Sequence, residues 1–96
     1  MLTLLVLQGP DKGRRFELPD APALLGRDSR QIPLTDQTVS RRHAELRQEG
    51  AAYWIVDLDS TNGVEVNGRR LRRAKLEDGD TFVVGETEIA FSTEPE

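Results

Sequence analysis

Turn-forming residues interrupt this sequence at close intervals, and the runs between them are short. The 96 residues include eight Gly and five Pro. Between these breaks, residues 2–7, 53–58 and 87–91 are rich in β-branched, aromatic or alternating apolar side chains, the pattern of short strands. We count about ten or eleven such runs and expect an all-β fold. The prediction is a two-sheet β-sandwich of mostly antiparallel strands, with its binding loops at one end.

Two stretches leave a choice of local structure. Residues 40–48 contain good helix formers, including Ala44 and Leu46. We prefer a strand because Gly50 and the strand-like run 51–58 follow within hairpin distance. Farther along, Asn62-Gly63 and Asn67-Gly68 are separated by three residues, so one pair is expected to form a shaped loop rather than a hairpin turn. Residues 69–73 are then expected to form a return segment.

The residue inventory excludes several classes of protein. The chain has no Cys and a single His, which leaves almost no material for a zinc or haem site, so we expect no metal and no cofactor. The first apolar run is about seven residues long and lacks the features of a signal peptide. We expect one domain over residues 1–92, a polar tail over 93–96, no membrane span and a cytoplasmic location.

Charge is distributed unevenly along the chain. The net charge is −4, from 13 basic and 17 acidic residues. Residues 26–75, however, carry ten basic and seven acidic side chains, and the two flanks carry three and ten. A positive centre on an acidic protein favours a local anionic ligand and discourages general adhesion to nucleic acid.

Polar clusters fall on the loops that separate the predicted strands of this positive centre. They are Gly26-Arg27, Ser40-Arg41-Arg42-His43, Asp59-Ser60-Thr61-Asn62-Gly63 and Val66-Asn67-Gly68. Alternate loops of an antiparallel meander share one end of the sheet, so distant clusters can converge on one surface. A guanidinium, two hydroxyls and a carboxamide all donate hydrogen bonds, and together they suit a phosphorylated side chain.

These clusters, in this order and spacing, resemble the forkhead-associated (FHA) domains, a family of phosphothreonine-binding β-sandwiches. The resemblance also includes Leu76-x-x-Gly79-Asp80 and Gly85, and covers nearly the whole chain. It implies phosphate contacts from Arg27 and Ser40, often a third from Arg41, commonly a further one from Thr61, and a contact of Asn62 with the peptide backbone. His43 is implied to be architectural, with Gly26, Gly63 and Asn67 supporting the loops. The implied function is a non-enzymatic adaptor that binds phosphothreonine proteins downstream of a Ser/Thr kinase.

Other interpretations are weaker. Ser40 and His43 could suggest catalysis, but residues three apart on a strand point to opposite faces and no second His is present. The basic run 69–75 is the best argument for a nucleic-acid-binding domain, against which stand a pI near 5.0 and few aromatic residues. A phospho-independent scaffold using the same surface is the remaining alternative.

Overall fold

The computed structural model describes residues 2–19 and 21–93, and this part of the chain forms two sheets. The six-stranded sheet has the order β2-β1-β11-β10-β7-β8 and comprises β1 (Leu2–Gln8), β2 (Arg15–Leu18), β7 (Val64–Val66), β8 (Arg69–Leu71), β10 (Thr81–Val84) and β11 (Thr87–Thr93). The five-stranded sheet has the order β4-β3-β5-β6-β9 and comprises β3 (Ala23–Gly26), β4 (Ile32–Pro33), β5 (Ala44–Glu49), β6 (Ala52–Asp57) and β9 (Arg73–Leu76).

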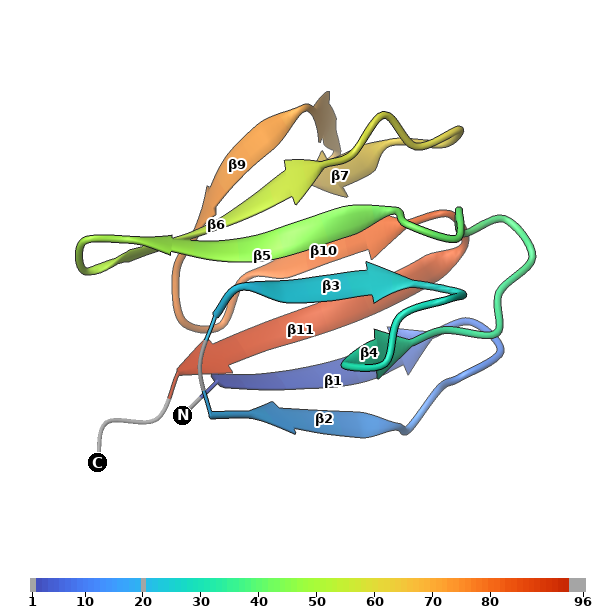
Figure 1. Ribbon diagram of the computed structural model, residues 1–96, viewed down its shortest axis with the longest axis horizontal. Coiled ribbons are helices and arrows are strands. Elements are labelled where there is room, and N and C mark those ends of the chain that lie inside the picture. Colours follow the sequence, from blue (N-terminus) through green and yellow to red (C-terminus); the bar gives the residue numbers. More distant parts are fainter. Residues whose placement is uncertain (1, 20, 94–96) are drawn as a thin grey trace.

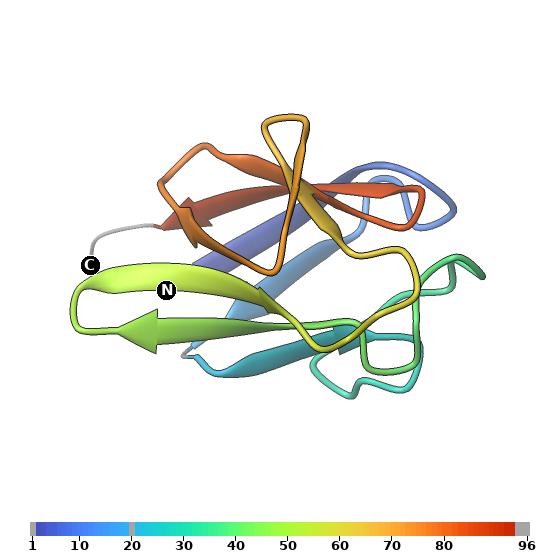
Figure 2. The same ribbon diagram turned by 90° about the horizontal axis from the view of Figure 1, so that it is seen from above.

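The two sheets lie as separate layers (Figure 2), which confirms the predicted β-sandwich. All pairings are antiparallel except that of β3 with the edge strand β4. Alternate residues of the strands point into the space between the sheets, including Leu4, Phe91 and Leu25, each with no exposed surface. Burying a large apolar side chain contributes about 1.5–3 kcal/mol, and twenty apolar residues are buried here. This core holds the strand ends, and therefore the loops, in place.

The choice between helix and strand over residues 40–48 is settled in favour of strand. β5 pairs with β6 continuously, from Ala44 opposite Asp57 to Glu49 opposite Ala52. Gly50, with a φ of 63°, forms the turn between them. The prediction of this hairpin is confirmed, and β5 contributes the buried Leu46 to the core. Pairing across the sheet outweighs the helix propensity of these residues.

The second Asn-Gly pair forms the tight turn, and the first lies in a loop. Asn67 and Gly68 have φ values of 54° and 78° and connect β7 to β8, with Val66 opposite Arg69. Two positive φ values match the type I′ turn for which Asn-Gly is preferred. The prediction that only one pair makes a hairpin is confirmed.

The return segment predicted for residues 69–73 returns along β7 only as far as Leu71. β8 pairs with β7 in one sheet, and β9 pairs with β6 in the other, so the chain crosses between the layers at Arg72. No Gly or Pro marks this crossing. The local sign of the break is a change in the spacing of apolar residues, which is three positions from Leu71 to Ala74 and two from Ala74 to Leu76.

The last strand reaches the end of the described residues. β11 runs through Thr93, whose N–H donates to Asp78 Oδ1 at 2.8 Å and which pairs with Leu2. Residues 94–96 of the predicted tail, like Met1 and Asp20, lie outside the described residues. Within the described part of the chain, no helix is long and apolar enough to cross a membrane.

Candidate functional site

Loops from both sheets gather at one end of the sandwich, opposite the β5–β6 turn (right in Figure 1). There they enclose a shallow depression of about 130 Å³, which is lined by Arg27, Gln37, Thr38, Val39, Ser40, Thr61 and Asn62. Four of the five residues predicted to contact a phosphopeptide therefore lie together, although they come from three separate loops. Arg41 is the one that does not line the depression.

Arg27 is fixed by the loop opposite to it. Its Nε donates to the carbonyl of Val39 at 2.6 Å, and its backbone N–H donates to the carbonyl of Ser40 at 3.2 Å. This approach depends on Gly26, because a Cβ there would lie 2.7 Å from the carbonyl carbon of Arg41. With Nε occupied, the two Nη groups of Arg27 have no partner among residues 2–19 and 21–93.

His43 connects two of the loops from beneath the depression. It is completely buried; its Nδ1 accepts from the N–H of Ser40 at 3.0 Å, and its Nε2 lies 2.7 Å from the carbonyl of Gly63. Because a carbonyl can only accept, Nε2 carries the proton and the imidazole is neutral in this arrangement. The ring therefore fixes the spacing between Ser40 and the loop that carries Thr61 and Asn62.

The hydroxyl of Ser40 and the carboxamide of Asn62 are oriented by backbone groups. Ser40 Oγ accepts from the N–H of Thr61 at 3.1 Å, so the hydroxyl proton is left to donate elsewhere. Asn62 Nδ2 donates to the carbonyl of Thr38 at 2.7 Å, which leaves Oδ1 and the second N–H available. Asn62 and Thr61 are exposed, and the Thr61 hydroxyl has no partner within the described residues.

Asp36 organises the loop that carries Thr38 and Ser40. Only 2% of its surface is exposed; Oδ1 accepts from the N–H and the hydroxyl of Thr38, at 2.8 and 2.6 Å. Oδ2 accepts from the N–H of Glu86 at 3.0 Å and the hydroxyl of Thr87 at 2.7 Å. Burial raises the pKa of Asp36, but these donated hydrogen bonds outweigh it and leave the pKa below its usual value of 3.8.

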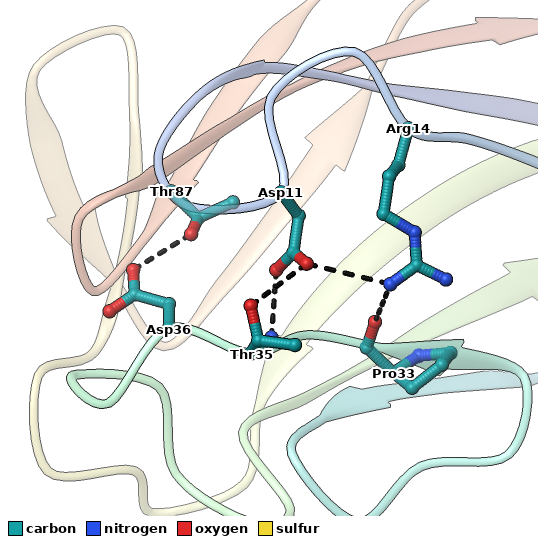
Figure 3. A network of polar contacts seen from close by, with 6 residues as sticks. All are labelled: Asp11, Arg14, Pro33, Thr35, Asp36 and Thr87. Atoms are coloured by element: carbon teal, nitrogen blue, oxygen red, sulfur yellow. Dashed lines mark hydrogen bonds and ion pairs between the residues drawn. The ribbon is translucent and has the colours of Figure 1, made fainter.

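A second buried carboxylate holds the same loop from the other side. Asp11 accepts from the N–H and the hydroxyl of Thr35, at 2.7 and 2.9 Å, and lies 3.4 Å from Arg14 Nη1 (Figure 3). Asp11 and Asp36 thus anchor neighbouring residues of one loop to the β1–β2 turn and to the start of β11.

Sequence reasoning missed both carboxylates. The spacing Asp36-x-Thr38 is a usable signal, because Asp side chains commonly accept from the N–H two residues ahead. Asp11 gave no comparable signal, since its partner Thr35 is 24 positions away.

Arg41 and Asn67 are among the predicted residues that do not line the depression. The side chain of Arg41 is exposed and has no partner within the described residues, while its carbonyl accepts from the N–H of Asp28 at 3.1 Å. Asn67 lies in the β7–β8 turn, where its positive φ shapes the hairpin. Among the described residues, no three His, Cys, Asp or Glu side chains are grouped so as to hold a metal ion.

Comparison with known proteins identifies the family of this arrangement. Residues 23–85, which include the whole depression, match the family model described as the FHA domain. The chain belongs to the FHA family. The resemblance seen in the sequence motifs is thereby confirmed.

Similar proteins agree with this assignment. The glycogen accumulation regulator GarA of Mycolicibacterium smegmatis is 44% identical over 94 residues, which cover 96% of this chain and 59% of the relative. An FHA domain solved for a structural and functional analysis of phosphothreonine-dependent FHA domain interactions has a TM-score of 0.86 and 37% identity, and covers 99% of this chain and 98% of that one.

Mycobacterium tuberculosis EmbR, solved in complex with a low-affinity phosphopeptide, has a TM-score of 0.82 and 35% identity over 95% of this chain and 24% of EmbR. This FHA domain thus spans somewhat more than half the length of GarA and about a quarter of EmbR.

Proposed function

We propose that this FHA domain binds protein segments that contain phosphothreonine, and that Arg27, Ser40, Thr61 and Asn62 make the contacts. The observation that carries this proposal is the depression itself, where a cation and several free hydrogen-bond donors converge at fixed positions. The solved relatives studied with phosphothreonine and with a phosphopeptide support it.

The chemistry of the ligand matches these groups. A phosphothreonine carries about 1.5–2 negative charges and three acceptor oxygens. The free Nη groups of Arg27 can bind two of these oxygens in a fork, and the hydroxyls of Ser40 and Thr61 can donate to the remainder. Asn62 Oδ1 is left to accept an N–H of the peptide backbone.

The site is built before the ligand arrives. The contact groups are fixed through Val39, Thr38 and His43, and the loop itself is anchored by the buried Asp36 and Asp11. A preformed site loses little conformational entropy on binding. The loops can therefore hold a modest number of contacts in the geometry that a phosphate needs.

Arg41 takes a different role in this proposal. Its exposed side chain has no partner in the described chain, so it is free to turn toward a bound ligand. An exposed ion pair of this kind contributes about 0.2–1 kcal/mol. We further propose that the domain is a non-enzymatic adaptor, acting in the cytoplasm downstream of a Ser/Thr kinase.

Calorimetric titration with one peptide in phosphorylated and unphosphorylated form tests the proposal. The phosphorylated form should bind and the other should not, and Arg27→Ala should weaken binding about 10- to 100-fold, as expected for the loss of a hydrogen-bonded charge. Arg30→Ala is the matched control, because Arg30 is exposed nearby but does not line the depression. Equal affinity for the two peptides would point to a phospho-independent scaffold and contradict the proposal.

A further inference from the structure

The basic side chains of this domain divide into those with acidic partners and those without. Five of them form ion pairs within the described residues: Arg14–Asp11, Arg15–Glu17, Arg47–Glu45, Arg73–Glu49 and Lys75–Glu77. Arg42, Arg70 and Arg72 have neither an ion pair nor a side-chain hydrogen bond in that part of the chain. All three are exposed.

These free arginines line two adjoining hollows beside loop 59–63. One of about 360 Å³ contains Arg70 and Arg72, and the other, of about 570 Å³, contains Arg42 and Arg72. The hollows share Arg72, Asp57 and Asp59, so they form one continuous surface, which we call the basic groove. Thr61 and Asn62 line the phosphate depression, and Ser60 and Gly63 of the same loop line the groove.

Arg70 is placed against that loop by the absence of a side chain at Gly63. A Cβ on Gly63 would lie 2.9 Å from Arg70 Cζ, so the guanidinium occupies the space that a larger residue would fill. Gly63 itself is fixed, because its N–H donates to Ser60 Oγ at 2.9 Å and its carbonyl accepts from His43. A positive charge is therefore held one residue away from Asn62.

The acidic residues of the groove do not neutralise its arginines. Asp57 Oδ1 accepts from the N–H and the hydroxyl of Ser60, and neither Asp57 nor Asp59 forms an ion pair within the described residues. Arg47 also lines the groove but is paired with Glu45, so three arginines without an ion pair face these two carboxylates. The groove keeps a positive excess on a chain of net charge −4.

We propose that the basic groove binds acidic side chains, either carboxylates or a second phosphate, of the same segment that inserts its phosphothreonine in the depression. The inference rests on the proposed function and adds to it a preference for acidic partners. An extended chain advances about 3.3 Å per residue, so a segment in contact with Asn62 can bring neighbouring side chains along loop 59–63 to Arg70, which lies against Gly63 of that loop. Positive charge at this place selects for negative charge.

A matched set of peptides tests the inference. One phosphothreonine peptide has Ala at every flanking position, and two others carry Glu on the amino or on the carboxyl side. The wild-type domain should bind one Glu peptide about three- to tenfold more tightly than the Ala peptide, as expected for two exposed charge pairs. Phosphoserine in place of Glu distinguishes a second phosphate from a carboxylate, and higher ionic strength should reduce either gain.

Substitutions test whether the gain in affinity for the Glu peptide comes from the groove. Combining Arg70→Gln with Arg72→Gln should bring the ratio of the Glu-peptide and Ala-peptide affinities to about one. Arg69→Gln is the matched control; Arg69 is exposed and free on the same hairpin but lines neither hollow, so the ratio should persist. Thermal unfolding of each variant verifies that it is folded.

Four outcomes would overturn the inference, and they can be told apart. Equal affinity for the Ala and Glu phosphopeptides would leave the proposed function standing and remove only the groove. Loss of phosphate dependence with every peptide would remove both. If the gain in affinity for the Glu peptide persists in the double variant, the acidic preference belongs to another surface. Tight binding of a thymidine oligonucleotide that only the double variant loses would assign the groove to nucleic acid.

Discussion

Replacing Asp36 with Asn tests whether the loop that carries Thr38 and Ser40 depends on a buried negative charge. The carboxylate accepts four hydrogen bonds, two from Thr38, one from the N–H of Glu86 and one from the hydroxyl of Thr87. Asn has nearly the same shape but offers one oxygen, and its NH₂ group must face two of these donors. A hydrogen bond to a charged group contributes about 1.5–3 kcal/mol. The Thr87 hydroxyl can rotate to accept instead, so we expect Asp36→Asn to cost about 2–4 kcal/mol.

The pH dependence gives this prediction a second readout. The folded state holds the pKa of Asp36 below its usual value of 3.8. The contribution to stability is therefore complete above that value and is lost as the pH falls through the folded pKa. The difference in unfolding free energy between wild type and Asp36→Asn should be large at pH 7 and should shrink as the solution is acidified below about pH 4.

Urea unfolding, followed through the fluorescence of Trp54, measures both effects. Asp28→Asn is the control, since Asp28 is an exposed acid at the same end of the molecule. The phosphopeptide affinity of Asp36→Asn should also fall, because the Thr38 carbonyl that orients Asn62 belongs to the loop that Asp36 holds. A loss below about 0.5 kcal/mol at pH 7, or a loss that is independent of pH, would refute the reasoning.

Three further substitutions examine separate parts of the site. Gly26→Ala should destabilise the fold by about 1–3 kcal/mol, because its Cβ would collide with the backbone at Arg41; unchanged urea unfolding would contradict this. His43→Leu should lower the unfolding free energy by about 2–5 kcal/mol, because it leaves the Ser40 N–H and the Gly63 carbonyl unpaired. A stable variant with normal phosphopeptide binding would show that the link between these two loops is dispensable. Asn62→Ala should weaken phosphopeptide binding about fivefold or more and alter stability little, since Asn62 is exposed. Calorimetry measures the affinity and urea unfolding measures the stability. Normal affinity would exclude the contact of Asn62 with the peptide backbone.

Much of the fold could be predicted because the information is local. Strand alternation and turn residues indicated the short strands, and Asn67-Gly68 has the backbone preference that its hairpin needs. The break at Arg72 was missed because it is set by which sheet each half joins, and neighbouring residues do not encode that choice.

In the candidate site, too, the residues with local sequence signals could be predicted, and those placed by long-range contacts could not. The motifs pointed to Arg27, Ser40, Thr61 and Asn62, and these residues do meet in one depression. The exclusion of Arg41 from it depends on side-chain direction, which spacing alone does not reveal. Asp11 was missed because its bonds to Thr35 span 24 positions. Asp36 had a local signal in its spacing to Thr38, but its bond to Thr87 spans 51 positions. Long-range polar contacts of this kind become visible only in three dimensions.

The central claim is that the phosphate is bound at the loop end of the sandwich. Amide chemical shifts in a ¹⁵N-labelled domain, recorded while a phosphothreonine peptide is added, test this most directly. The account predicts that the largest shifts fall at Arg27, Ser40, Thr61 and Asn62 and vanish with the unphosphorylated peptide. Shifts concentrated around the β5–β6 turn at Gly50, or equal shifts with both peptides, would contradict it.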